Sequence, residues 1–452
     1  MNNSMLYNIN RLYLLIGIML YTLLIGYWSG NVFNYAHYNI LNILTFCSFI
    51  FTIWNNTNKP ESYYSESKIV GIVFLYSTVF VSLYMMMSDY YTDNTFIFSE
   101  ADARNYERTS FAIKDMSFLE AIRYIVIARG WTYEDWGAPM FMGFILKLIP
   151  SKLFLNFVYV GLNTLGALFL FRIGKFIMSV QYAFLATLAY AISSYSVFFM
   201  GVFLKEQIMV FLVITSLYLL YEYWENKHMY FLVLGGVLSS LLFFFRPAIT
   251  VFVWISYAVM MMSGTKSNVV KLSFIIVGIG VLGLTYSAMM QSAERFDDAS
   301  KYVNSTFSEA TKIVVYLGGL VGPFPAIFQT QEIITYKPLF GSGLLYKFLL
   351  FFPFWKGFVY CLKSRSLEVL PLFSFVVVEI LSLYFVLDTL ELRKSMPHVP
   401  LFILAAFWYM DKYDDDADED VQQTPYYVWS RRQLFFCAFL VFAMSLVWNT
   451  MK

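Results

Sequence analysis

Apolar stretches about 17–22 residues long recur along the chain, and this is the length that a helix needs to cross the hydrocarbon core of a bilayer. A helix satisfies its own backbone hydrogen bonds in lipid, so each stretch is predicted to be helical. Charged residues make up only 13% of the chain, against about 25% in soluble domains. The chain therefore has too few charged residues to cover itself with a polar, water-exposed surface. The sequence predicts an all-α polytopic membrane protein.

We expect about 12–13 transmembrane helices, with a large helical extracytoplasmic loop after the third. The predicted helices lie at 12–29, 39–54, 69–87, 152–171, 179–199, 206–224, 230–245, 247–263, 272–290, 342–361, 367–387, 398–410 and 434–449. They divide the chain into three N-terminal helices (1–88), the extracytoplasmic loop (89–152), a transmembrane core (153–410) with an outer loop at 291–341, an acidic cytoplasmic linker (411–433) and a C-terminal helix (434–452).

Basic residues in the short loops predict the orientation of these helices. If the N-terminus is cytoplasmic, the connections on the cytoplasmic side carry Lys59, Lys68, Arg172, Lys175, Lys227, Lys266, Lys271, Lys363 and Arg365. The outer connection at 30–38 contains neither Lys nor Arg. This orientation places the 89–152 loop outside. The net charge of +1 argues against nucleic acid as a partner.

The 89–152 loop is the most polar part of the chain before residue 411 and is predicted to be structured. Residues 116–129 place Leu119, Ile122, Ile125 and Val126 on one predicted helical stripe, which suits a helix lying at the membrane surface. A second short helix is expected at 139–149, where Pro139 occupies a favourable first position. The predicted loop therefore carries two surface helices before the span that begins at 152.

Four acidic residues on the outer face are candidates for catalysis: Asp102, Glu134, Asp135 and Glu206. A carboxylate just outside a membrane can act as a general base towards a hydroxyl group or bind a metal ion. The alternatives are a solvated loop charge for Asp102 and a helix-dipole interaction for Glu206. Glu379 lies in the middle of a predicted span, where it needs a partner or a wet cavity, and could be structural or a relay in a transporter.

Basic residues on the same face are candidates for binding a phosphate group: Lys205, Arg246, Arg393 and Arg104. The arginine guanidinium can hold a phosphate through two parallel hydrogen bonds. Arg246 lies at the outer end of a predicted helical hairpin, directly before Pro247. The alternatives are snorkelling to the interface for Arg246 and Arg393, and pairing with a nearby acid for Arg104.

The order of these motifs resembles that of the GT-C superfamily of integral-membrane glycosyltransferases. An acid in the first large outer loop (DARNY, Asp102) is followed by DWGAPMFMGFILKLIP and by a span ending in a basic turn (NTLGALFLFRIGKFI). Then come LKE (Lys205 and Glu206), FRP (Arg246 and Pro247) and a late basic-proline segment (RKSMPHVPLFILAAF). The resemblance covers roughly residues 85–410. Two extra hydrophobic spans precede the acidic loop, where that family commonly has one, and we expect no soluble C-terminal domain.

The resemblance implies a transferase that moves a sugar from a polyprenyl-phosphate-linked donor to a lipid or glycan hydroxyl, in contact with membrane lipids. It implies that Asp102 is the general base or the acid that orients the acceptor, and that Glu134, Asp135 and Glu206 assist it or hold a divalent ion. Arg246, Arg393 and Lys205 would bind the departing phosphate. No cofactor is certain. The acids leave open a divalent cation, Mg²⁺ or Mn²⁺. A bacterial inner (plasma) membrane location, with an extracytoplasmic site, is the corresponding expectation.

Two further functions stay open on the sequence. An O-antigen or capsule repeat-unit polymerase has a similar number of spans and would place more weight on Arg246, Arg393 and the 291–341 loop. A lipid-linked oligosaccharide flippase or other transporter should show internal repeats and charges along a central path. The sequence shows no clear repeat, and its charges gather towards one face, so transport is the least favoured of the three.

Overall fold

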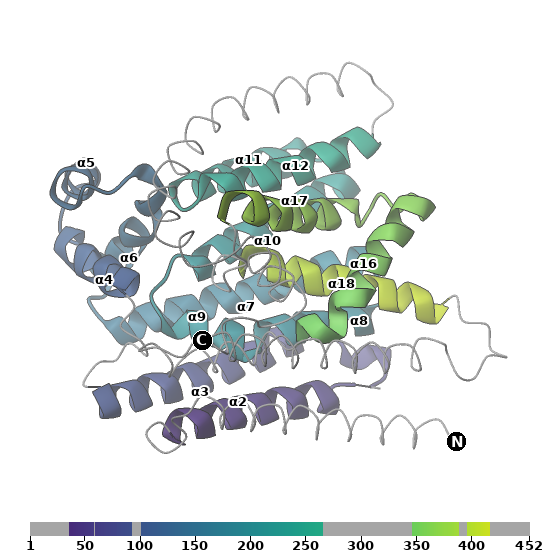
Figure 1. Cartoon of the computed structure of the whole chain (residues 1–452), viewed down its shortest axis with the longest axis horizontal. Helices are drawn as coiled ribbons and strands as arrows, with labels where there is room; N and C mark the ends of the chain where they lie inside the picture. Colours follow the sequence, from purple (N-terminus) through teal and green to yellow (C-terminus); the bar gives the residue numbers. More distant parts are fainter. Residues whose placement is uncertain (1–35, 58, 93–100, 265–345, 388–395, 416–452) are drawn as a thin grey trace, which may run out of the picture.

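The computed structural model of the chain describes residues 36–57, 59–92, 101–264, 346–387 and 396–415. These residues form helices and turns, and no strand occurs among them. In Figure 1 most of the longer helices lie roughly along the horizontal axis. Three shorter helices, α4 (Ala101–Ile113), α5 (Phe118–Arg123) and α6 (Gly137–Leu148), lie at the left-hand end of the bundle.

Three described helices are long and apolar enough to cross a membrane: α3 (Glu66–Thr92) over Glu66–Met86, α7 (Lys152–Ile177) and α10 (Glu206–Asn226). The helices α8 (Val180–Ala191) and α9 (Ser194–Gly201) are bent by 46° and count as a fourth span if taken together. The prediction of an all-helical protein with membrane-spanning helices is therefore confirmed. The predicted helices at 12–29, 272–290 and 434–449 lie outside the described residues, and the total of about 12–13 spans stays a prediction.

The remaining helices complete the bundle. They are α2 (Ala36–Asn55), α11 (Met229–Leu241), α12 (Pro247–Gly264), α16 (Tyr346–Ser364), α17 (Leu370–Leu387) and α18 (Val399–Asp415). Short turns of tighter or wider helix join some of them: η1 (Glu61–Tyr63), η2 (Tyr124–Ala128), η3 (Tyr133–Asp135), η4 (Leu242–Phe244) and η5 (Met396–His398).

α7 is the central helix of this arrangement, because it packs against α3, α8 and α10. α10 also packs against α11, α12 against α17, and α18 against α16 and α8. Gly174 of α7 allows a close approach to α8, since a Cβ atom added there would lie 2.7 Å from the Cβ of Ala183. The core is largely aromatic and aliphatic, and Tyr159 and Trp408 are completely buried within it.

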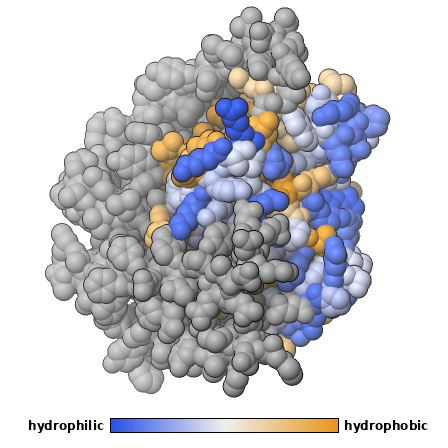
Figure 2. Space-filling view, turned by 90° about the vertical axis from the view of Figure 1, so that its right-hand side faces the viewer, coloured by the Kyte–Doolittle hydropathy of each residue, from blue (hydrophilic) through white to orange (hydrophobic). Residues whose placement is uncertain are grey.

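Polar contacts join neighbouring helices at the end of the bundle that lies opposite α4. Glu66, the first residue of α3, accepts hydrogen bonds from Arg172 and Lys175 near the end of α7, both at 2.7 Å. Asp411 of α18 accepts two hydrogen bonds from Ser179, directly before α8. Figure 2 faces this end and shows hydrophilic side chains gathered beside apolar ones. The predicted acidic linker from 411 is thus wrong at its start, because α18 continues to Asp415 and Asp411 is buried.

The predicted helix at 116–129 forms, but its apolar stripe differs from the prediction. Ser117 and Glu120 form a capping box that starts α5. Ile125 is completely buried against Ile113 and Ala121, whereas Leu119 is 76% exposed. The four apolar residues therefore do not share one face: Ile125 points into the protein, and Leu119 lies on an exposed apolar face. The change to a π-helical turn at η2 shifts the residues after Arg123 around the axis.

Candidate functional site

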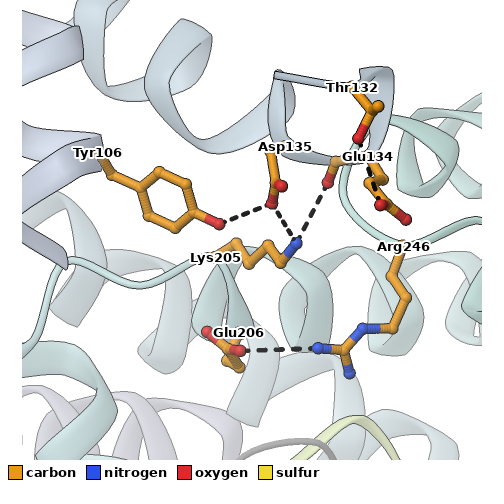
Figure 3. Close-up of polar contacts among 7 residues, drawn as sticks. All are labelled: Tyr106, Thr132, Glu134, Asp135, Lys205, Glu206 and Arg246. Carbon is orange, nitrogen blue, oxygen red and sulfur yellow. Dashed lines mark hydrogen bonds and ion pairs between the residues drawn. The ribbon is translucent and has the colours of Figure 1, made fainter. Parts of the chain in front are cut away.

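Five polar side chains from four separate parts of the chain meet at the α4 end of the bundle, as Figure 3 shows. Tyr106 comes from α4, Asp135 from η3, and Lys205 and Glu206 from the start of α10. Arg246 lies between η4 and α12. Ion pairs and hydrogen bonds connect these residues in two groups, one around Asp135 and one between Glu206 and Arg246. We call these five residues the polar cluster.

The local sequence explains why the two helix starts lie where they do. Glu206 is the first residue of α10, where the positive end of the helix dipole favours an acid. Pro247 is the first residue of α12, a position at which proline's missing N–H costs nothing. Lys205 and Arg246 therefore stand directly before two helices that pack against each other. This confirms the predicted positions of Lys205 and Arg246 at helix starts.

Stacked aromatic rings hold η3 against η4 and so bring Asp135 towards Arg246. The rings of Tyr133 and Phe243 are parallel within 8° with centroids 5.0 Å apart. Those of Trp136 and Phe244 are parallel within 13° at 6.4 Å. Such pairs contribute about 0.5–1.5 kcal/mol each beyond the area they bury. We refer to these four residues as the aromatic clasp.

Gly137 lies against the ring of Phe245, next to the aromatic clasp. Replacing Gly137 with alanine is expected to destabilise the packing around the polar cluster. A Cβ atom at position 137 would lie 2.6 Å from the buried ring of Phe245, so the ring or α6 must shift. Overpacking of this kind costs about 1–3 kcal/mol. We expect a lower melting temperature in detergent for Gly137→Ala. Gly161→Ala is the matched control, because nothing lies within 4 Å of an added Cβ there, and equal melting temperatures would contradict this packing.

Asp135 is the acceptor at the centre of the first group. Its Oδ1 accepts hydrogen bonds from the Tyr106 hydroxyl at 2.8 Å and from Lys205 Nζ at 2.7 Å. Lys205 Nζ also donates to the backbone carbonyl of Glu134 at 3.2 Å. The Lys205 side chain is 10% exposed and that of Asp135 34% exposed. Asp135 is therefore reachable from solvent while its cation is almost enclosed.

The surroundings of Asp135 keep it ionised and keep Tyr106 neutral. Burial alone would raise the pKa of Asp135, but the charge and hydrogen bond of Lys205, together with the bond from Tyr106, outweigh it and lower the pKa. Burial raises the pKa of Tyr106 well above its ordinary value, and the nearby negative charge of Asp135 raises it further. Tyr106 therefore donates its proton to Asp135 without losing it.

The lowered pKa of Asp135 predicts a stability that depends on pH. The folded protein binds a proton at this carboxylate less readily than the unfolded chain, in which the pKa is about 3.9. The contribution of Asp135 is therefore complete above about pH 4–5 and is lost as the pH falls through the lowered pKa. We expect the melting-temperature difference between wild type and Asp135→Asn to shrink as pH falls from neutral towards 3. A difference that stays constant over that range would contradict the ion pair.

Glu206 and Arg246 form the second group, which lies deeper. The Glu206 side chain is completely buried, and its Oε1 lies 3.8 Å from an Arg246 guanidinium nitrogen. The Arg246 side chain is 21% exposed. A carboxylate without access to water is costly unless a cation or hydrogen-bond donors compensate for the lost hydration. The guanidinium thus faces a buried acid while part of the Arg246 side chain stays exposed.

The structure brings together most of the residues that the sequence singled out. Glu134, Asp135, Lys205, Glu206 and Arg246 lie in one region, where Thr132 donates to the Glu134 carboxylate at 3.3 Å. Asp102 lies one turn before Tyr106 on α4 and interacts with it electrostatically. Arg104 lies on the same helix but is exposed, and among the described residues it forms no hydrogen bond or ion pair with the polar cluster. Arg393 lies outside the described residues.

Tyr106 is the member of the polar cluster that sequence reasoning missed. It lies in DARNYER, a stretch read as loop around Asp102, although Asp102 and Tyr106 are four residues apart and share a face once α4 forms. Within the described part of the chain, no three His, Cys, Asp or Glu side chains are grouped in a way that could hold a metal ion. The prediction of a divalent cation therefore gains no support from these residues.

No protein-family model matches the chain, and no curated protein sequence is similar to it. The chemistry of the polar cluster therefore has to be argued from its own geometry. That geometry combines a reachable, ionised carboxylate, a neutral phenol and two cations within one region at the end of a membrane bundle. Such a set can orient a hydroxyl group and stabilise an anion that forms beside it.

Proposed function

We propose that this protein is a GT-C-like membrane glycosyltransferase, which moves a sugar from a polyprenyl-phosphate-linked donor to a hydroxyl group of a lipid or glycan. Transfer takes place at the extracytoplasmic face of a bacterial inner membrane and serves the assembly of a cell-surface polysaccharide or glycolipid. The observation that carries the proposal is the convergence of Asp135, Lys205, Glu206 and Arg246 at one end of a helical membrane bundle.

The reaction needs an acceptor for one proton and a stabiliser for one leaving group. The acceptor hydroxyl oxygen forms a bond to the anomeric carbon of the sugar, and the bond from that carbon to the phosphate oxygen breaks. The hydroxyl proton passes to a carboxylate, and the electron pair leaves with the phosphate. Asp102 and Asp135 are the carboxylates that our proposal assigns to the hydroxyl, and the polyprenyl phosphate is the second product.

The cations fit the leaving group in this proposal. Negative charge builds up on the phosphate as the glycosidic bond breaks, and preorganised cations in a partly dry site stabilise that charge strongly. Arg246 is the better placed of the two, because about one-fifth of its side chain is exposed, against about one-tenth for Lys205. Lys205 is nearly enclosed and contacts Asp135. In the proposal Lys205 chiefly orients Asp135, and Arg246 meets the phosphate.

Transport is less well supported by the described residues. The polar cluster gathers at one end of the bundle, whereas a transporter needs ionisable side chains along a path through the membrane. Glu379 lies in the middle of the apolar helix α17, and His398 faces it at 3.5 Å with both side chains almost completely buried. A pair that is packed in this way fits a structural contact better than a water-lined path.

The proposed activity is tested with membranes that contain the overproduced protein. They are supplied with a set of radiolabelled polyprenyl-phosphate sugars, and transfer to lipid or glycan is followed for wild type and Asp102→Asn. Asp115→Asn is the matched control, because Asp115 is exposed, precedes α5 and shows only a 4.0 Å contact with Lys114. Transfer by wild type and the control, but not by Asp102→Asn, is the expected result. No transfer by wild type from any donor would overturn the proposal.

A further inference from the structure

A buried amide in the middle of α7 connects four other helices. Asn163 is 1% exposed, and its Nδ2 donates to the Ala191 carbonyl of α8 at 2.9 Å and to Ser77 of α3 at 3.4 Å. Its Oδ1 accepts hydrogen bonds from Ser196 of α9 at 3.0 Å and from Gln207 of α10 at 3.2 Å. We call these contacts the Asn163 network. A single side chain therefore uses both its donor and its acceptor atoms in the interior of the bundle.

The network lies where the backbone is irregular and buried. α8 ends at Ala191 and α9 begins at Ser194 after a 46° bend, although every residue from 183 to 210 is buried. A helix break leaves carbonyl groups without their usual partners, and such groups are tolerated at membrane depth only when protein or water satisfies them. Asn163 satisfies Ala191, while Ser193 caps α9 by accepting a hydrogen bond from the Ser196 N–H. The broken helix is thus supported by specific side chains.

Through Gln207 the same network reaches the polar cluster. Gln207 is the second residue of α10 and directly follows Lys205 and Glu206. N–H groups in the first turn of a helix have no partner within that helix, so the first turn is held less firmly than the interior. The hydrogen bond from Gln207 to Asn163 ties this first turn to α7. Lys205 and Glu206 therefore stand directly before a residue that is hydrogen-bonded deeper in the bundle.

We propose that Asn163 is a positioning residue that acts through Gln207 to hold Lys205 and Glu206 in place. The hydrogen bonds of Asn163 go to Ser77, Ala191, Ser196 and Gln207, and so reach Lys205 and Glu206 only through Gln207. The break between α8 and α9 brings Ser196 to the same amide, so the broken helix and the start of α10 share one anchor. The inference concerns the geometry of the polar cluster and holds whether or not the cluster transfers sugars.

Gln207→Met separates this positioning role from a role in folding. The Oε1 of Gln207 is buried and has no hydrogen-bond partner in the described part of the chain. Methionine removes one hydrogen bond but also one unsatisfied buried oxygen, so the melting temperature should change little. Asn163 keeps its contacts with Ala191 and Ser196. Ser77→Ala is the matched control, because it removes the other long contact of Asn163 without affecting α10.

The test is the reactivity of Lys205 towards reductive methylation, measured by mass spectrometry on the purified full chain without substrate. The exposed Lys147 of α6 serves as the internal reference. Loss of one buried hydrogen bond is expected to raise the relative labelling of Lys205 about fivefold in Gln207→Met. Ser77→Ala should label like wild type. Equal labelling of Lys205 in all three proteins would overturn the inference, as would an equal rise in both variants. Because no sugar is used, the result is independent of the transferase assay.

Discussion

Replacing Asp135 with asparagine is expected to lower sugar transfer by at least about a hundredfold, the smaller end of what one preorganised electrostatic contact contributes. The hydrogen bonds from Tyr106 and Lys205 to Asp135 both end on Oδ1, so Oδ2 is the oxygen left to meet an acceptor hydroxyl within the described part of the chain. Asparagine keeps the shape and one carbonyl oxygen, but it lacks the negative charge that makes a carboxylate a strong hydrogen-bond acceptor. The loss is measured as initial rates at saturating donor.

The comparison of Asp135→Asn with Asp102→Asn separates two roles. The lowered pKa of Asp135 makes it a weak base but a good hydrogen-bond acceptor. If Asp102 takes the proton and Asp135 orients the hydroxyl, then Asp102→Asn loses kcat, whereas Asp135→Asn loses both kcat and acceptor affinity. Asp115→Asn again serves as the control, because it removes a negative charge from an exposed position just before α5. Transfer by Asp135→Asn at more than about a tenth of the wild-type rate would remove Asp135 from the mechanism.

Most helices could be predicted from the sequence, because an apolar run of sufficient length leaves the backbone no other choice in lipid. The predicted helix at 206–224 corresponds to α10, and that at 247–263 to α12. The break in the predicted helix at 179–199 was not predicted. Three serines, Ser193, Ser194 and Ser196, follow Ile192, and serine is favoured at the start of a helix, so the sequence did hold a signal for the break. The bend is also supported by Asn163, a side chain from another helix. Hydropathy does not report such a tertiary contact.

The candidate site was predictable as a set of residues but not as a set of pairs. Charged residues beside membrane helices are rare enough to stand out, which is why Lys205, Glu206 and Arg246 were chosen. Their partners depend on how η3 and η4 meet, and stacked aromatic rings decide that contact. In a chain that is 20% aromatic, no single tyrosine or phenylalanine signals such a role. The partner of Glu379 could likewise not be predicted from the sequence, since His398 follows it by 19 residues and lies in another element.

Replacing Arg246 with methionine is expected to destabilise the protein by about 3 kcal/mol, the lower end of the cost of breaking a buried ion pair from one side. The lower end applies because Arg246 is partly exposed, whereas Glu206 is completely buried. Methionine keeps much of the apolar length of arginine, so the loss reports the charge. Thermal unfolding in detergent measures it, with Arg123→Met as the matched control, since Arg123 is exposed on α5.

A second substitution tests whether Glu206 is the cause of that loss. Adding Glu206→Gln to Arg246→Met removes the buried negative charge, so the double variant should regain most of the lost stability. Sugar transfer should stay abolished, because the cation that meets the phosphate is still missing. A double variant that melts as early as Arg246→Met alone would show that Arg246 stabilises something other than Glu206. Recovery of transfer together with stability would remove Arg246 from phosphate binding and leave it a structural partner of Glu206.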